Sequence, residues 1–392
     1  MRPFPDAAAA LRQSPIRAVT FAVDRVGGIN LGQGICDLPT PEPIRDGAVR
    51  SLDRGVSTYT AYAGIPRLRA AIADKARRFN GLPVTSDDEV VVSVGATGAF
   101  AATLLALCGA GDEVVVFEPA YGYHIGLLRL FGITPVGVPL RGDAFAFDPA
   151  DLAAAVTPRT RAVLLCTPAN PSGKVWTEDE IRAVYAVADA HDLWVVTDEI
   201  YEYLAYDGHR HVSPASLGAG AYARTVTISG FSKTYNMTGW RLGYAVAPLA
   251  VAERIGLVGD LLYVCAPEPL QQGVAEAFSM DDGYVDAMRR DYGARRARMM
   301  AALDACGFGA RAPDGAYYVL ADIRPLAARM PGFETDLAAA DTLIERAGVG
   351  TVAGSGFFLD PARGRHLLRF CYAKDEAVLA DACAQLVDAF GR

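Results

Sequence analysis

One lysine and one arginine lie close together in a segment that otherwise carries no charge. The segment is Ser229-Gly-Phe-Ser-Lys-Thr-Tyr-Asn-Met-Thr-Gly-Trp-Arg-Leu-Gly-Tyr244, in which Arg241 follows Lys233 by eight positions. The next residues, 242–247, are apolar and predict a buried strand. A lysine beside such a strand is desolvated, which lowers the pKa of its amine and lets it attack a carbonyl. The pair therefore predicts a cofactor anchor: Lys233 forms a Schiff base with an aldehyde, and Arg241 holds a phosphate of the same molecule.

The alternative is a solvated loop lysine beside an ordinary surface cation, which is the common state of these residues. The length of the segment argues against it, because the whole stretch resembles the lysine signature of the class I and II aminotransferases. These enzymes have fold type I, that of the aspartate aminotransferase superfamily, and use pyridoxal 5′-phosphate. The resemblance covers almost the whole chain. It implies an α/β fold, with a large domain whose central, mainly parallel sheet lies between helices, and a smaller α/β lobe.

The chain between residues 89 and 247 alternates short β-branched runs with helical patterns, as expected of a parallel sheet covered by helices on both faces. Thr177-Glu-Asp-Glu180 predicts a capping box that opens a helix running toward His191. The predicted strands are Val90–Val94, Glu113–Phe117, Ala162–Thr167, Leu193–Thr197, Thr225–Ser229 and Gly243–Ala247.

The character of the chain changes after about residue 290, where a basic helical stretch is followed by strands near Ala316–Leu320 and His366–Tyr372. We expect residues 46–290 to form the large cofactor-binding domain. Residues 1–45 and 291–392 are expected to form the small domain together, as the resemblance implies. In open α/β sheets ligands lie beyond the carboxyl ends of the strands, so the residues just after each strand are the candidates for chemistry.

Gly95-Ala-Thr-Gly98 follows the first strand and opens a helical run, so its backbone N–H groups suit a phosphate. On its own this is a common strand-to-helix turn. Beside Lys233 it predicts a phosphate cup made of Ala96, Thr97, Arg241 and either Ser229 or Ser232; the sequence leaves the choice of serine open.

Three further strand ends resemble family segments that hold the cofactor ring. Tyr121, in Glu118-Pro-Ala-Tyr-Gly-Tyr123, matches the aromatic residue that stacks on the ring. Asn170, in Thr167-Pro-Ala-Asn-Pro-Ser-Gly173, matches the asparagine that binds O3′ and also contacts the substrate carboxylate. Asp198 matches the aspartate that keeps the ring nitrogen protonated, and is preferred to Glu199 by motif position, while Tyr201 matches the tyrosine that donates to O3′.

Two segments are expected to bind the substrate. Arg369 is a lone arginine in the apolar strand His366-Leu-Leu-Arg-Phe-Cys-Tyr-Ala373, where it needs a carboxylate partner from the protein or from a ligand. It matches the family arginine that grips the substrate α-carboxylate. Gly34 matches the glycine of the family's substrate loop, although Cys36 stands where a proline is more usual.

The segment Tyr59-Thr-Ala-Tyr-Ala-Gly-Ile-Pro-Arg-Leu-Arg69 resembles the one in which a tyrosine of one subunit touches the phosphate bound in the other. The resemblance thus implies a homodimer with shared active sites, in which Tyr59 crosses to the partner. Twofold dimers are also the commonest oligomers.

The composition excludes several other classes of protein. With 52% hydrophobic and 21% charged residues the chain is globular, and a net charge of −8 without a dense basic block argues against a nucleic-acid or membrane partner. No apolar run is long enough to span a bilayer and no signal peptide is evident, so we expect a cytoplasmic protein. The seven cysteines lack a Cys-x-x-Cys pair and suit reduced residues. His209 and His211 are expected to be solvated in a polar loop, so no metal is predicted.

The resemblance implies a transaminase that moves the amino group of an L-amino acid to a 2-oxo acid such as 2-oxoglutarate by a ping-pong mechanism. A neutral or aromatic donor is favoured, because Thr97 stands where one aspartate-specific branch has a lysine. A carbon–sulfur β-lyase would use the same anchors and stays open; it would not require an oxo acid. A non-catalytic regulatory module that binds the same cofactor is disfavoured, because such proteins carry a fused DNA-binding domain and only about 45 residues precede the expected core.

Overall fold

A seven-stranded mixed sheet forms the centre of the large domain in the computed structural model, which describes residues 4, 9, 15–55, 58–280 and 283–392. The strand order is β2-β8-β7-β6-β5-β3-β4, and β8 runs antiparallel to both of its neighbours while the other pairs are parallel. The strands are β2 (Val90–Val94), β3 (Glu113–Glu118), β4 (Thr134–Pro139), β5 (Thr160–Cys166), β6 (Trp194–Asp198), β7 (Thr225–Gly230) and β8 (Leu242–Val246).

The six strands predicted from the sequence are confirmed to within two residues, but β4 was not predicted. Its sequence, Thr-Pro-Val-Gly-Val-Pro, contains two prolines and a glycine, which normally argue against a strand. The structure places β4 at the edge of the sheet, where it pairs only with β3. Proline is tolerated there, because an edge strand leaves one row of its N–H groups unpaired.

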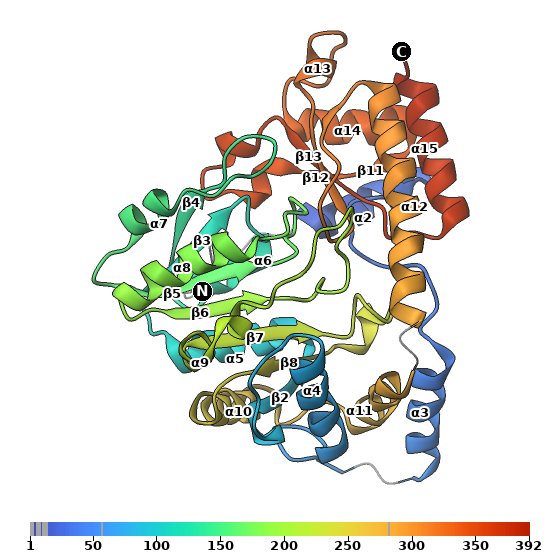
Figure 1. Cartoon of the computed structure of the whole chain (residues 1–392). Helices are drawn as coiled ribbons and strands as arrows, with labels where there is room; N and C mark the ends of the chain where they lie inside the picture. Colours follow the sequence, from blue (N-terminus) through green and yellow to red (C-terminus); the bar gives the residue numbers. More distant parts are fainter. Residues whose placement is uncertain (1–3, 5–8, 10–14, 56–57, 281–282) are drawn as a thin grey trace.

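Helices cover both faces of this sheet, as Figure 1 shows. Along β3 the side chains alternate: Val114 and Val116 pack in one core with α5, α6 and α10, whereas Val115 and Phe117 pack in another with α7 and α8. The predicted capping box at Thr177 and Glu180 is present and starts α8. The helices of this domain are α3 (Glu42–Asp53), α4 (Pro66–Arg78), α5 (Gly95–Leu107), α6 (Gly122–Leu130), α7 (Pro149–Ala155), α8 (Glu178–Ala190), α9 (Ala219–Ala223), α10 (Leu249–Tyr263) and α11 (Glu268–Ala275).

The C-terminal third forms the predicted smaller α/β lobe, drawn in orange and red in Figure 1. Its antiparallel sheet has the order β12-β13-β10-β9, and a parallel pair joins β1 (Ile29–Asn30) near the N-terminus to β11 (Val349–Gly350). The N-terminal segment therefore packs on this lobe, as expected. The remaining elements are α2 (Pro15–Val26), α12 (Gly283–Cys306), β9 (Gly309–Ala310), β10 (Tyr318–Asp322), α13 (Arg324–Ala327), α14 (Asp336–Ala347), β12 (Val352–Ala353), β13 (Leu367–Cys371) and α15 (Glu376–Phe390).

The predicted domain limit at residue 290 falls inside α12, which continues without a break from the large domain into the small lobe. At the other limit, α3 packs against α11 of the large domain from residue 42 onward. We keep the division into 46–290 and 1–45 with 291–392 as a proposal.

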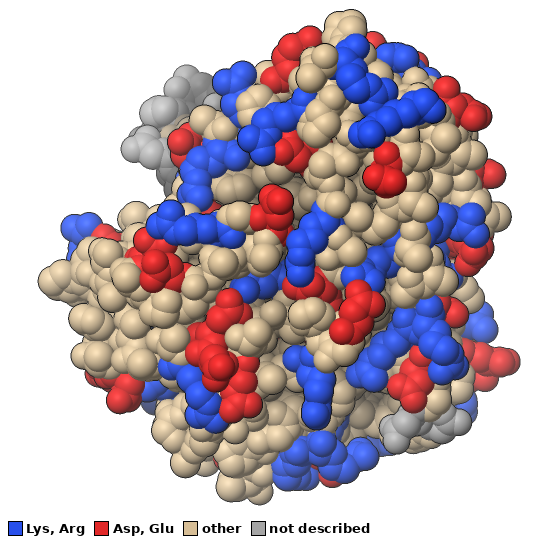
Figure 2. All heavy atoms as spheres, turned by 45° about the horizontal axis from the view of Figure 1, so that its top comes forward, with Lys and Arg blue, Asp and Glu red and all other residues tan. Residues whose placement is uncertain are grey.

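The surface carries both signs of charge. On the face shown in Figure 2, lysine and arginine side chains alternate with aspartate and glutamate, and neither sign forms a continuous field. Within the described ranges, no helix is both long enough and apolar enough to cross a lipid bilayer.

Candidate active site

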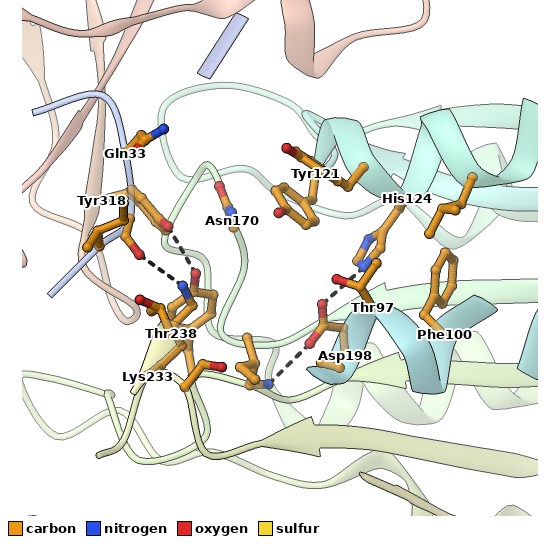
Figure 3. Close-up of a pocket in the computed structure, with 18 of the residues that line it drawn as sticks. Gln33, Thr97, Phe100, Tyr121, His124, Asn170, Asp198, Lys233, Thr238 and Tyr318 are labelled. Carbon is orange, nitrogen blue, oxygen red and sulfur yellow. Dashed lines mark hydrogen bonds and ion pairs between the residues drawn. The ribbon is translucent and has the colours of Figure 1, made fainter. Parts of the chain in front are cut away.

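A cavity of about 1060 Å³, part of it open to solvent, lies at the carboxyl ends of the parallel strands. The residues predicted from the sequence line it, with the exception of Ser229 and Tyr59. The parallel strands β2, β3, β5, β6 and β7 all end here. The residues that follow them are far apart in the sequence but lie together at this edge of the sheet. Figure 3 shows the cavity with its side chains.

Lys233 lies in the turn after β7, and its Nζ donates a hydrogen bond to the backbone oxygen of Gly34 over 2.9 Å. Burial lowers the pKa of the Lys233 amine. Cys36 and Cys371 oppose this shift, and the smaller effects of the Arg369 and Arg241 guanidinium groups add to the lowering. The amine is thereby brought closer to the neutral form, which is the form that can attack a carbonyl or accept a proton.

A comparison among the lysines singles out Lys233. The sequence contains four lysines, all within the described residues. Lys75, Lys174 and Lys374 each form an ion pair, with Glu202 at 2.5 Å, Glu180 at 2.7 Å and Asp37 at 3.1 Å respectively. Lys233 has no carboxylate partner among the described residues. It is the lysine whose surroundings suit a nucleophile rather than a structural cation.

The residues predicted to form a phosphate cup lie together at the start of α5. Ala96 and Thr97, in the first turn of α5, line the cavity together with Ser232 and Arg241. The Arg241 guanidinium approaches Gly95 so closely that a Cβ atom there would lie 2.4 Å from Nη2, which explains the glycine. Backbone N–H groups, hydroxyl groups and a guanidinium together form a site for a phosphate dianion.

Ser229, the other candidate serine, does not belong to the phosphate cup. Its hydroxyl donates to the carboxylate of Glu202 over 3.0 Å in a buried network behind the turn, and it does not line the cavity. The reason is the period of the strand: Ser229 is still part of β7, where its side chain points to one face of the sheet, whereas Ser232 lies in the turn. Ser232 is the serine available to a phosphate.

Asp198 ends β6 and lies 3.0 Å from Nε2 of His124, measured from Oδ2. Figure 3 shows the imidazole of His124 pointing toward this carboxylate. His124 lies on α6, three residues after Tyr121, and packs edge-on against the Tyr121 ring at 5.2 Å. The sequence reasoning missed His124; its only signal was a lone histidine three positions, about one helical turn, beyond the predicted stacking residue.

Tyr201 lies against a second tyrosine that was not predicted. Its Oη is 3.0 Å from Oη of Tyr318, and burial raises the pKa of both phenols, that of Tyr318 to about 12. Both are therefore neutral donors at physiological pH. A Cβ on Gly34 would lie 2.0 Å from the Tyr318 hydroxyl, so only glycine fits at this point of the substrate loop.

Arg369 is 1% exposed and lacks an ion pair with any carboxylate in the described part of the chain. Its Nη1 donates to Oδ1 of Asn170 over 2.8 Å and its Nη2 to the backbone oxygen of Gly32 over 2.6 Å. Its Nε has no hydrogen-bond partner among the described residues. The Tyr318 ring lies 4.2 Å from the guanidinium. A buried cation held by neutral groups alone is costly, so this site is ready for an anionic ligand.

His211 corrects a further prediction, because it is buried rather than solvated. Its side chain is 4% exposed and its Nε2 lies 2.8 Å from Glu199. His209, by contrast, is 40% exposed near Asp314. Glu199, Glu202 and His211 come close enough to hold a metal ion, but the Lys75 ammonium already lies 2.5 Å from Glu202 and supplies a positive charge. The fold brings Lys75 there from α4, which the local sequence around the histidines does not reveal.

The groups around the cavity suit pyridoxal 5′-phosphate. Lys233, desolvated and without a carboxylate partner among the described residues, would hold the aldehyde, the cup at α5 would hold the phosphate, and Asp198 would offer its carboxylate to the ring nitrogen. Tyr121 follows β3 and lines the cavity as the predicted stacking residue. Asn170 accepts a hydrogen bond from Arg369 through Oδ1, and its Nδ2 would be the donor to O3′.

Comparison with known proteins agrees with this geometry. The family description "Aminotransferase class I and II" matches residues 26–386. A probable N-succinyldiaminopimelate aminotransferase of Mycobacterium tuberculosis is 37% identical, with 96% of this chain and 97% of the relative aligned. The aspartate/prephenate aminotransferase of Thermus thermophilus is 35% identical, over 99% of this chain and 97% of the relative.

Solved structures agree as well. The structure of the N-succinyldiaminopimelate aminotransferase from Mycobacterium tuberculosis superposes with a TM-score of 0.93 at 35% identity, covering 99% of this chain and 100% of that one. Escherichia coli YbdL, described with a methionine aminotransferase function, superposes with a TM-score of 0.92 at 29% identity and the same coverage. The chain therefore belongs to the class I and II aminotransferases, enzymes of fold type I that transfer amino groups with pyridoxal 5′-phosphate.

Proposed function

We propose that this aminotransferase takes the amino group of an L-amino acid with a neutral or aromatic side chain and passes it to 2-oxoglutarate or a similar 2-oxo acid, in a ping-pong sequence. The residues that line the cavity support this choice of amino donor. Among the described residues, its lysine and arginine side chains are Lys233, Arg241 and Arg369. In this proposal they bind the cofactor aldehyde, the phosphate and the substrate α-carboxylate respectively. A distal carboxylate on the donor finds no further positive charge from this chain, whereas Ile35, Tyr123 and Leu127 offer apolar surface.

In this proposal Arg369 and Asn170 hold the α-carboxylate of either substrate. The guanidinium supplies the charge and the free Nε donor, while its contacts with Asn170 and Gly32 fix its orientation. Because donor and acceptor both carry an α-carboxylate, one arginine serves both halves of the reaction. Side chains of different size then occupy the same apolar part of the cavity.

Lys233 is the base that removes the Cα proton and later returns it. When bound, pyridoxal 5′-phosphate acts as an electron sink for the Cα carbanion and carries the amino group between the two halves of the reaction. The Asp198 carboxylate, held by His124, would keep the ring nitrogen protonated, and Tyr121 would fix the plane of the ring. The depressed pKa of the Lys233 amine favours the neutral base that proton removal requires.

The relatives include enzymes named for N-succinyldiaminopimelate, aspartate and prephenate, and arginine with pyruvate. Those names span acidic and basic substrates of different shape, so similarity alone does not select one for this chain. They are all aminotransferases, which favours amino transfer over the β-lyase and the non-catalytic module.

A panel of amino donors tests the donor class. We expect purified holoenzyme with 2-oxoglutarate to convert at least one of methionine, phenylalanine and kynurenine, with kcat/KM at least about tenfold above that for aspartate, because an unpaired carboxylate would have to be desolvated in the cavity. The measurement is the rate of 2-oxo acid formation. Turnover of aspartate alone would contradict the proposal, and release of pyruvate and ammonia from cystathionine without an oxo acid would support the lyase instead.

The proposal includes a homodimer with shared sites. Leu261 is 89% exposed at the end of α10, and Leu257, Leu262 and Val264 are exposed nearby; Tyr59 is 81% exposed. Gly256 of α10 lies directly against Tyr62, and Tyr263 packs beside Gly98 in the first turns of α5. The exposed apolar end of α10 thus borders the phosphate cup. A second copy covering it would bring its own Tyr59 toward the phosphate, as the resemblance implies.

Leu261→Asp tests this interface. Each dimer buries two copies of the side chain, at about 2 kcal/mol each, so we expect the dissociation constant of the dimer to rise by roughly 10³-fold. Sedimentation velocity would show monomer at micromolar concentration, with weaker cofactor retention. Leu337→Asp, at a leucine 62% exposed on α14, is the matched control and should stay dimeric. A dimeric, fully active Leu261→Asp enzyme would refute this interface.

A further inference from the structure

A second cavity lies behind the turn that carries Lys233. It measures about 990 Å³ including space open to solvent, and it is bounded by the end of α4, the segment after α11 and the start of α12. We call it the rear cavity. None of the residues assigned above to the cofactor or to the substrate lines it.

Five aromatic rings line the rear cavity. Phe79 and Tyr203 lie with ring centroids 4.4 Å apart, and Tyr235 and Tyr284 stack at 5.5 Å with an angle of 22° between their planes. Phe278 adds a fifth ring. Such walls bind flat, apolar groups, because a ring can stack on them or meet their edges.

Two phenols on this wall have unused hydrogen-bonding capacity. Tyr235 is only 8% exposed, and neither its hydroxyl nor that of Tyr203 has a hydrogen-bond partner among the described residues. Burial raises the pKa of Tyr235 to about 12 and that of Tyr203 further still, so both are neutral donors. Both hydroxyls are accessible from the cavity and are not used within the described residues, so they are free to donate to a ligand that accepts a hydrogen bond.

Among the described residues that line the rear cavity, Lys75, Arg78 and Arg289 carry positive charge and Asp286 carries negative charge. Lys75 is committed to Glu202 at 2.5 Å. Arg289 donates through Nε to the backbone oxygen of Tyr203 over 2.8 Å, which holds it at the cavity wall, and its Nη1 lies 3.4 Å from Asp286 in a partly exposed pair. Arg78 pairs with Asp74 at the surface. Exposed pairs of this kind contribute little, so the terminal nitrogens of Arg289 can exchange Asp286 for a ligand anion at small cost while Nε stays bound to Tyr203.

We propose that the rear cavity is a second small-molecule site that binds a planar aromatic carboxylate. The ring of the ligand lies among the aromatic side chains, and its carboxylate accepts hydrogen bonds from the phenols and from Arg289. The proposal does not depend on which amino donor the enzyme uses.

The rear cavity is linked to the catalytic turn. Tyr235 follows Lys233 by two residues, and the Tyr284 hydroxyl donates to the backbone oxygen of Thr234 over 2.7 Å. A ligand packed on Tyr235 and Tyr284 therefore presses on the segment that positions Lys233. Binding there changes the environment of the cofactor without entering the active site, so the cofactor's absorption band reports it.

Calorimetric titration with benzoate tests the proposal, with neutral benzamide as the matched probe. The titration uses Arg369→Ala holoenzyme, so that the carboxylate site of the active centre does not compete. We expect one benzoate per chain, and benzamide about tenfold weaker, because it lacks the charge. Tyr235→Phe and Arg289→Gln should each weaken benzoate about fivefold or more, whereas Arg290→Gln, at an exposed arginine next to Arg289, should not.

Absence of saturable benzoate binding to Arg369→Ala holoenzyme would overturn the proposal, as would unchanged affinity in both Tyr235→Phe and Arg289→Gln. A second measurement needs no variant: wild-type crystals soaked in 4-bromobenzoate should show an anomalous bromine peak in the rear cavity. A bromine peak beside Arg369 and none in the rear cavity would refute the second site.

Discussion

Lys233→Ala should abolish amino transfer, with kcat/KM lower by about 10⁴-fold or more, because one amine both anchors the cofactor and moves the Cα proton. No other lysine can replace it. Lys75, Lys174 and Lys374 are each bound to a carboxylate, and only Lys233 among the four faces the cavity. The measurement is oxo-acid formation from the best donor of the panel, together with the absorption spectrum of the purified variant.

Chemical labelling provides the control for this prediction. Borohydride reduction of the wild-type holoenzyme should fix the cofactor on one peptide, the one that contains Lys233, as read by mass spectrometry. Lys174→Ala, which removes a lysine paired with Glu180, should retain the label on Lys233. A label on any of the other three lysines, or full activity in Lys233→Ala, would refute the assignment.

Residues that follow a strand were predictable from the sequence. Lys233, Asp198 and Asn170 each stand within a few residues of a β-branched run, and the carboxyl ends of those runs meet at one edge of a parallel sheet. The pattern of the strand and the chemistry of the next residue are both local, so short segments carry the information. The family resemblance then supplied the roles.

Contacts between distant strands were not predictable in the same way. Tyr318 reaches Arg369 because Leu320, two residues away on β10, pairs with Arg369 of β13. That register depends on the packing of the whole small lobe, and a shift of one residue would turn Tyr318 to the other face. Nothing in the segment around Tyr318 distinguishes it from a core tyrosine.

Buried charge networks were missed for a related reason. His211 was expected in solvent because its neighbours in sequence are polar, yet it is bound to Glu199. The network that buries it draws on Lys75 from α4 and on Ser229 from β7. Local polarity predicts exposure only where no distant partner neutralises the group. The choice between Ser229 and Ser232 as phosphate ligand was open in the sequence for the same reason, because the network that occupies Ser229 is not visible there.

Arg369→Ala should raise KM for every amino donor and for the oxo-acid acceptor, by roughly 10²-fold, because all of them share the α-carboxylate and the loss of a buried charge-assisted contact costs a few kcal/mol. Steady-state kinetics over the donor panel measures this. Arg369→Lys keeps the charge but not the planar fork, so it should fall between the wild type and the alanine variant. Arg365→Ala, at an exposed arginine four residues earlier, is the control and should leave KM unchanged. If Arg369→Ala impaired donors of one side-chain class and spared the others, the arginine would bind the side chain rather than the α-carboxylate. The assignment of the apolar part of the cavity to the donor side chain would then also be wrong.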